Sequence, residues 1–399
     1  MKRPLNRDTH IVHLARPPYQ DGRRPVNPPV VRASTVDFET LEAMNQARSQ
    51  AVRGEQSFIY GVRGTPTSFA LETLISHLEN GAGTKLFSSG LEAIAAVFLG
   101  FLKPGDDVLV VDTVYAPVRA LLNRFLADRQ IQFRFYSPRE PDLGALVKPN
   151  TRMIYTESPG SVTMELQDVS LVAAAIKDRP DIVIACDNTW SSGFCYRPLE
   201  HGADLSIVAG TKYLGGHSDV LMGSVTANEK TLASLNETVG LLGMAVSADD
   251  CALVLRGART LHIRYPAHAQ RALAVAQWLE GHDEIVGVLY PPLPSSPDHD
   301  LWHSQFEGAA GLFTIELADS KKNNRHVSGF VDHLKLFGIG ASWGGFESLA
   351  LPCDLTGLRS IEDSRHQGSL VRLHIGLEDP RDLIADLDQA LAKWAAGVK

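Results

Sequence analysis

The chain has 399 residues, of which 44% are hydrophobic and 21% are charged, and its formal net charge is −8 at pH 7. This composition is typical of a globular protein with a large core. The negative charge argues against nucleic acid as the main partner, because no excess of Lys and Arg can neutralise phosphates. With four cysteines and no CxxC spacing, no visible secretory signal and no apolar run of membrane-spanning length, we expect a soluble cytoplasmic protein.

Residues 1 to about 60 are rich in proline and arginine, with Pro17-Pro18 and Pro28-Pro29. The only helical pattern there lies near 38–48, so this stretch cannot form a core of its own. A long irregular arm usually packs on its own domain or on a neighbouring subunit. A disordered tail is the alternative, but the apolar and aromatic residues of this stretch, including Tyr60, argue against it.

From about 66 to 225 the pattern alternates between helix and strand. The predicted helices are 69–78, 91–101, 118–127 and 169–177, and the predicted strands are 107–111, 131–136, 152–156, 182–186, 205–209 and 220–226. This alternation predicts an α/β fold with a mostly parallel central sheet covered on both faces. Ligands in such sheets bind beyond the carboxyl ends of the strands, so the loops there are where the chemistry is expected.

The C-terminal third has its own strand and helix signals. Residues 228–275 are mainly helical, further signals occur at 311–317, 327–336 and 371–375, and an amphipathic helix closes the chain at 380–394. These signals predict a smaller C-terminal α/β domain. The expected division is an N-terminal arm at 1–63, a large domain at 64–259 and a small domain at 260–399.

Small residues precede the helix predicted at 91–101. In Ser88-Ser89-Gly90, exposed backbone N–H groups and the positive end of the helix dipole would form an anion site suited to phosphate. Ser89 could equally be a plain helix cap. The nearby Gly81-Ala-Gly83 lacks the third glycine and the preceding strand of a dinucleotide-binding fingerprint.

Two charged residues follow predicted apolar strands. Asp187 ends the strand at 182–186, and a buried carboxylate needs a partner: a helix N-terminus, an arginine or a protonated ring nitrogen. Lys212 follows the strand at 205–209, where burial would disfavour its ammonium form and make the amine a better nucleophile. A surface lysine is the alternative. A phosphate site, a reactive lysine and a carboxylate at one sheet edge are what pyridoxal phosphate (PLP) needs from a protein.

The run from Ser206 to Asp219, Ser-Ile-Val-Ala-Gly-Thr-Lys-Tyr-Leu-Gly-Gly-His-Ser-Asp, resembles the lysine signature of the Cys/Met-metabolism PLP enzymes. Supporting stretches occur in the family's order at 60–67, 157–165, 187–190, 342–348 and 372–379. Together they cover nearly the whole chain. The resemblance implies the aspartate-aminotransferase-like fold, known as fold type I of the PLP enzymes.

The resemblance also implies roles for individual residues. Lys212 would hold the cofactor covalently and then carry protons, while Asp187 would keep the ring nitrogen protonated. Tyr115 would stack on the ring. The substrate α-carboxylate would be bound by Arg372, with Ser342 and Trp343 beside it, because a guanidinium offers two parallel hydrogen bonds.

The cofactor's phosphate would be held by Ser89, Gly90, Leu91 and Thr211, and by Tyr60 of a neighbouring subunit. Two positions depart from the family pattern. Val62 stands where the family usually has an arginine, so that either Arg63 substitutes or the phosphate clamp is weaker. Ala209 stands where a serine is common, which removes one hydroxyl from the phosphate site.

Among the family's reactions, the chain most resembles the bacterial branch that cleaves cystathionine by β-elimination into homocysteine, pyruvate and ammonia. The alternatives are γ-elimination, γ-replacement or lysis of another amino acid, such as canavanine, methionine or a cysteine conjugate. A binding protein that keeps the fold without catalysis is a further alternative. We also expect a homotetramer built from dimers with shared sites, and no metal, because His217 and Asp219 lack a third ligand.

Overall fold

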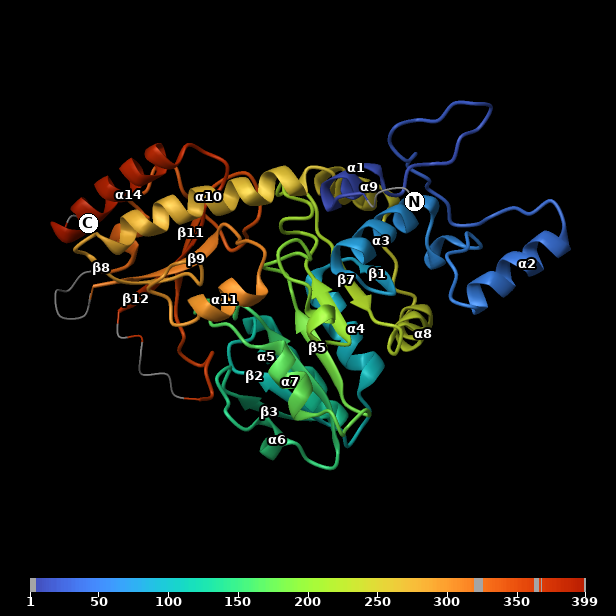
Figure 1. Ribbon diagram of the computed structural model, residues 1–399, viewed down its shortest axis with the longest axis horizontal. Helices are drawn as coiled ribbons and strands as arrows, with labels where there is room; N and C mark the ends of the chain where they lie inside the picture. The colour runs from blue at the N-terminus through green and yellow to red at the C-terminus, as the bar shows by residue number, and fades with distance from the viewer. Residues whose placement is uncertain (1–4, 319–325, 362–365, 367, 398–399) are drawn as a thin grey trace. The chain divides into compact units, whose positions relative to one another are not determined.

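The computed structural model describes residues 5–318, 326–361, 366 and 368–397 (Figure 1). The chain forms two compact units, each made of two segments. The first unit contains residues 1–103 and 183–262, and the second contains residues 104–182 and 263–399. The division into an arm, a large domain and a small domain, with boundaries near residues 63 and 260, remains a prediction. Within the described residues, no helix has both the length and the apolar character needed to span a membrane.

The first unit contains four strands in the order β1-β7-β6-β5. They are β1 (Gly83–Phe87), β5 (Val183–Asp187), β6 (Leu205–Val208) and β7 (Gly223–Ala227). The pair β5 and β6 is parallel, whereas β7 is antiparallel to both of its neighbours. Strand β1 was not predicted, because Gly83-Thr-Lys-Leu-Phe87 lacks a continuous apolar run. Its position places a strand directly before Ser88 and Ser89.

Four helices accompany these strands: α3 (Pro66–Glu79), α4 (Gly90–Phe101), α8 (Leu232–Leu242) and α9 (Ala248–Ala258). Helix α4 is apolar around most of its circumference, and it packs on β6, β7 and α8. Helix α3 packs on β1 and α9. Both α3 and α4 were predicted from their periodicity to within three residues at either end.

The N-terminal arm adds α1 (Arg7–His13), which was not predicted, and α2 (Leu41–Val52). Arg259, the C-cap residue of α9, holds the end of helix α1. Its guanidinium donates a hydrogen bond to the carbonyl of Leu14 at 2.6 Å. Helix α2 has no buried residue. It extends away from the strands of its own unit (Figure 1).

The second unit contains three parallel strands in the order β4-β2-β3. They are β2 (Asp107–Val111), β3 (Gln132–Tyr136) and β4 (Thr151–Glu157). The accompanying helices are α5 (Ala116–Leu121), α6 (Leu143–Leu146) and α7 (Val169–Ala175). The single helix predicted at 118–127 is instead α5 followed by a π-helical turn at Leu122–Leu126 and a 3₁₀ turn at Ala127–Arg129.

The second unit also contains a five-stranded sheet in the order β10-β11-β12-β9-β8. Its strands are β8 (Ile285–Leu289), β9 (Leu312–Leu317), β10 (Gly338–Ile339), β11 (Leu349–Cys353) and β12 (Ser369–His374). Its helices are α10 (Leu261–Glu280), which begins at the end of the first unit, α11 (His299–Gln305), α13 (Ser328–Val331) and α14 (Pro380–Ala395).

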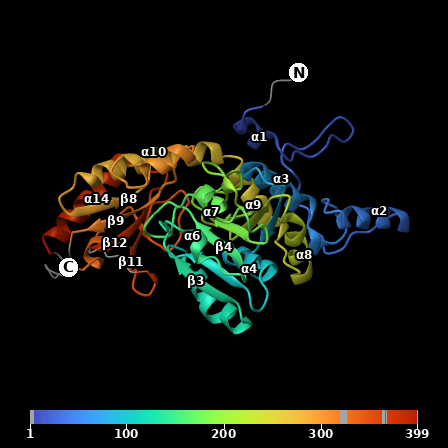
Figure 2. The same cartoon turned by 60° about the horizontal axis from the view of Figure 1, so that its bottom comes forward.

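Helix α14 shows why this part of the chain folds as it does. It buries Leu383, Leu387, Leu391 and Trp394, whose spacing puts them on one helical face. Both views show α14 and the C-terminal half of α10 close to the strands of the five-stranded sheet (Figures 1 and 2). Strand β12 is central in this sheet and antiparallel to β11 and β9, so it is a firm base for the side chains that it carries.

Candidate active site

Lys212 lies in a tight turn that begins where β6 ends. The amide of Lys212 donates to the carbonyl of Ala209 at 3.0 Å, and the amide of Gly216 donates to the carbonyl of Lys212 at 2.8 Å. Tyr213 and Leu214 are fully buried, whereas Lys212 is half-buried. The turn therefore holds the lysine backbone at one place while its side chain keeps access to the surface.

Asp187 ends β5 on the same edge of the sheet, because β5 runs parallel to β6 and pairs Asp187 with Ile207. Its carboxylate accepts hydrogen bonds from the amide of Thr189 at 3.0 Å and from the Thr189 hydroxyl at 2.6 Å. The same hydroxyl accepts from the amide of Ala209 at 3.0 Å. Thr189 therefore links the Asp187 carboxylate to the turn that carries Lys212.

Sequence reasoning missed this role of Thr189. The signal was present, because an aspartate commonly accepts a hydrogen bond from the backbone two residues later. What the sequence did not indicate is the bond from Ala209, which joins two segments that lie on different strands.

A buried polar cluster supports the backbone next to Asp187. The amide of the Asn188 side chain donates to both carboxylate oxygens of Glu79 at 3.2 Å, and the Ser206 hydroxyl donates to Glu79 at 2.7 Å. Burial raises the pKa of Glu79 to about 7, against the lowering effect of these hydrogen bonds. Since Asn188 follows Asp187 and Ser206 lies on β6, the cluster fastens the two strands that carry Asp187 and Lys212.

The start of α4 packs against the segment that leads to Lys212. A Cβ atom at Gly90 would lie 2.8 Å from the Cβ atom of Ala209, so only glycine allows this approach. The Ser89 hydroxyl caps the helix by accepting from the amide of Glu92 at 3.1 Å. The first-turn amides of Gly90 and Leu91 have no intrahelical acceptor, as in any helix, and the dipole favours an anion there. This arrangement fits the phosphate of a cofactor held at Lys212.

Thr211 differs from its expected role in detail. Its hydroxyl donates to the carbonyl of Met222 at 3.1 Å and accepts from the amide of Met222 at 2.9 Å. The hydroxyl hydrogen is therefore used within the protein, and the side chain would have to turn before it donated to a phosphate.

Tyr60 and Arg63 differ in their surroundings. Tyr60 is 52% exposed at the end of the arm. The guanidinium of Arg63 lies against α8, so closely that a Cβ atom at Gly240 would be 2.0 Å from Nη1. Arg63 therefore packs on its own chain in this structure, while the Tyr60 side chain extends outward.

In the second unit, Tyr115 lies between β2 and α5. Its amide donates to the carboxylate of Glu157, at the end of β4, over 2.7 Å, and its side chain is 45% exposed. Glu157 therefore holds the backbone at Tyr115. It belongs to the stretch 157–165 that supports the family resemblance, but no role was predicted for this residue.

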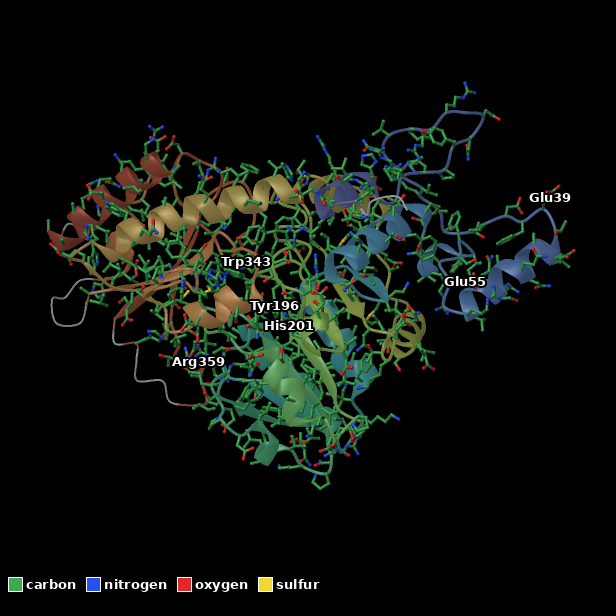
Figure 3. All side chains as sticks on the ribbon, in the orientation of Figure 1. Glu39, Glu55, Tyr196, His201, Trp343 and Arg359 are labelled. Atoms are coloured by element: carbon green, nitrogen blue, oxygen red, sulfur yellow. The ribbon has the colours of Figure 1, made fainter. Side chains whose placement is uncertain are left out.

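The residues around the end of β2 are held equally firmly. The buried carboxylate of Asp112 pairs with Arg119 and accepts from the amide of Ser360 at 2.9 Å. Arg359 (Figure 3), the neighbour of Ser360, pairs with Glu165 at 3.4 Å. The segment near 360 is therefore fastened to the loop that carries Tyr115.

Arg372 lies on β12, opposite Leu351 of β11 and Thr314 of β9. Its guanidinium donates to the carbonyl of Ala341 at 2.6 Å, directly before Ser342 and Trp343. Burial lowers the pKa of Arg372, while Cys353 and Tyr115 act in the opposite direction. Tyr115 and Arg372 therefore interact electrostatically within the second unit. Trp343, which is half-buried, follows Ala341 by two residues (Figure 3).

Comparison with known proteins agrees with this arrangement. The family model described as "Cys/Met metabolism PLP-dependent enzyme" matches residues 8–392. A cystathionine beta-lyase of Bordetella avium is 44% identical over 97% of this chain and 98% of its own. An L-alanine/L-glutamate racemase of Wolbachia pipientis is 39% identical over 94% of both chains.

The solved structures lead to the same family. The crystal structure of cystathionine gamma-lyase from Lactobacillus plantarum, complexed with L-serine, matches with a TM-score of 0.87. The identity is 27%, and the match covers 98% of this chain and 100% of that one. A match over nearly the full length, together with the lysine turn, the aspartate and the helix start, settles the assignment: the chain belongs to the Cys/Met-metabolism family of PLP-dependent enzymes.

Proposed function

We propose that this enzyme cleaves a carbon–sulfur bond by β-elimination, with cystathionine as its substrate. Cystathionine and water would give homocysteine, pyruvate and ammonia. The observation that carries the proposal is the edge of the first unit's strands, where Lys212, Asp187 and the start of α4 are joined through Thr189 and Ala209. The similarity to a beta-lyase over the full chain supports this reaction among those of the family.

Each residue has a defined task in this proposal. When bound, the cofactor supplies an electron-withdrawing ring that stabilises negative charge at the substrate Cα. Lys212 would tether the cofactor and, once displaced by the substrate amine, take the proton from Cα. Asp187 would hold the proton on the ring nitrogen. Loss of the Cα proton then allows the bond from Cβ to sulfur to break, with the thiolate as leaving group.

The family resemblance assigns further roles to four residues. Arg372 would bind the α-carboxylate, with Ser342 and Trp343 beside it, and Tyr115 would stack on the cofactor ring. The phosphate would lie at Ser89, Gly90 and Leu91, and at Thr211 after its hydroxyl has turned. The methyl group of Ala209 faces this helix start, so the phosphate site lacks the hydroxyl that a serine would offer.

The keto acid distinguishes the candidate reactions. With cystathionine and added PLP, we expect pyruvate and homocysteine in equal amounts, measured by derivatising both products and separating them chromatographically. Formation of 2-oxobutyrate would instead indicate γ-elimination. Cysteine, methionine and canavanine test the other lyase substrates, and inversion of L-alanine without any keto acid would favour the racemase reaction. Bound cofactor without any turnover would favour a binding protein.

We further propose that the enzyme is a cytoplasmic homotetramer built from dimers. The predicted division into an arm at 1–63, a large domain at 64–259 and a small domain at 260–399 gives the arm a task, which is to bring Tyr60 to the phosphate of a neighbouring subunit. The exposed Tyr60 and the absence of buried residues in α2 support this reading.

A mixing experiment tests the shared site. Tyr60→Ala is expected to lower cofactor retention, whereas Tyr19→Ala, at another exposed arm tyrosine, should not. Mixing inactive Lys212→Ala chains with Tyr60→Ala chains should restore activity above that of either variant, because one site per dimer then has both native residues. If oligomers shown to contain both variants recover no activity, Tyr60 acts at the site of its own chain. A molar mass by light scattering that equals one chain would contradict the tetramer.

A further inference from the structure

The segment from Ala341 to Ser348 connects β10 to β11 and contains Ser342 and Trp343, which we expect beside the substrate carboxylate. It is fastened along its length to β12 and the residues that follow that strand. Arg372 donates to the carbonyl of Ala341 at 2.6 Å, and the amide of Leu377 donates to the carbonyl of Phe346 at 2.8 Å.

The far end of the segment is held by a carboxylate. Glu378 accepts from the amide of Ser348 at 2.8 Å and from its hydroxyl at 2.9 Å. Gly376 allows the backbones to approach, because a Cβ atom there would lie 2.3 Å from the carbonyl oxygen of Phe346. The two ends of the segment are therefore anchored by polar side chains.

His374 contacts the middle of the segment. Its Nε2 atom lies 3.1 Å from the amide nitrogen of Gly344 and 3.0 Å from the carbonyl oxygen of Gly345. His374 and Arg372 are two residues apart on β12, so both side chains project from the same face of the strand. One strand thus carries both the expected carboxylate ligand and the ring that holds the neighbouring Trp343-Gly344-Gly345 turn.

The ring of His374 is suited to this role because it stays neutral. It is 1% exposed and lies 5.4 Å, centroid to centroid, from the ring of His268, which is fully buried on α10. Burial lowers the pKa of His374 to about 3 and that of His268 to about 4. A neutral ring makes one of two hydrogen bonds through Nε2: it accepts from the Gly344 amide when its proton is on Nδ1, or donates to the Gly345 carbonyl when its proton is on Nε2.

We propose that His374 is a positioning residue for substrate recognition, which fixes the turn at Gly344 and Gly345 so that Ser342 and Trp343 stand correctly beside Arg372. The inference rests on the proposed carboxylate site at Arg372. It assigns to His374 an effect on substrate binding rather than on the bond-breaking steps, which take place at Lys212 and the cofactor.

The test compares three variants of the holoenzyme. His374→Leu fills the space of the ring without a hydrogen bond and is expected to raise KM about tenfold, equivalent to about 1.4 kcal/mol, with kcat changed less than threefold. His374→Gln places an amide near the position of Nε2 and should recover most of this loss. His299→Leu is the matched control, because the part-buried His299 of α11 lies 3.3 Å through Nδ1 from the carbonyl oxygen of Pro291 and packs its ring on Trp302 rather than on His374.

Hydrogen exchange gives a readout that does not need turnover. With and without cofactor, peptides covering 341–348 should exchange faster in His374→Leu than in wild type, and at the wild-type rate in His299→Leu. Unchanged KM and exchange in His374→Leu, equal losses in His299→Leu, or no recovery in His374→Gln would each overturn the proposal. A wild-type enzyme that cleaves no sulfur amino acid would instead refute the proposed function, and the exchange data would still report whether His374 holds the turn.

Discussion

Lys212→Ala is expected to reduce turnover by at least about 10⁴-fold, because it removes both the tether of the cofactor and the base that takes the Cα proton. The protein should still fold, since the turn is held by backbone hydrogen bonds and by the buried Tyr213 and Leu214 rather than by the lysine side chain. The cofactor should still bind loosely through its phosphate. Initial rates with cystathionine and the visible absorbance of the dialysed protein measure the two effects.

Two further variants separate the chemistry of Lys212 from its charge. Lys212→Arg keeps a positive charge but cannot form the covalent link at working pH, so it should be as inactive as the alanine variant. Lys230→Ala is the control, because Lys230 lies in the same unit, has a 46% exposed side chain and pairs with Asp204 at 3.3 Å. A Lys212 variant with wild-type turnover would remove this residue from its assigned role.

Arg372→Ala is expected to raise KM by about 10²- to 10³-fold, as is usual when one partner of a desolvated charge pair is lost. Arg372→Lys should recover only part of this loss, since an ammonium group cannot form the two parallel bonds of a guanidinium. Arg372→Ala also removes the hydrogen bond to the carbonyl of Ala341, so Ser342 and Trp343 should move as well. Steady-state kinetics with cystathionine and with a substrate lacking the carboxylate measure the effect.

The control for Arg372 is Arg381→Ala. Arg381 pairs with Asp379 at 2.6 Å, but its side chain is 87% exposed, and an exposed pair contributes little. The KM of Arg381→Ala should stay within about twofold of the wild-type value, because the loss of an exposed ion pair changes the free energy little. If the ratio of the KM values for cystathionine and for the analogue without the carboxylate were the same in Arg372→Ala as in wild type, another residue would be the carboxylate ligand.

The parallel strands were the part of the fold that sequence could predict best. Strand β2 matches its prediction at both ends, because Asp107-Val-Leu-Val-Val111 is a continuous apolar run after a turn. Strand β1 was missed because its polar Thr84 is satisfied within the core by the hydroxyls of Ser76 and Thr226, both at 2.8 Å. The π-helical turn after α5 was missed because nothing in the local periodicity distinguishes it from continued α-helix.

In the candidate site, the residues that we propose for the chemistry could be selected from the sequence, whereas the residues that hold them in place could not. Lys212 and Asp187 follow apolar strands, and parallel pairing brings their strand ends together. Thr189, Glu157 and His374 were not assigned roles, because each acts through a hydrogen bond to a segment distant in sequence. Such contacts depend on strand order and register, which local patterns do not determine. The proposed assignment of Arg372 to the substrate carboxylate relied on the family resemblance for the same reason.

Trapping the cofactor tests the central claim most directly. Borohydride reduces the covalent link between a lysine amine and the aldehyde of PLP, and makes it permanent. After reduction and proteolysis, mass spectrometry should find one pyridoxyl group per chain, on the peptide that contains Lys212. Label on another lysine, or a colourless protein that takes up no cofactor and yields no labelled peptide, would contradict the account.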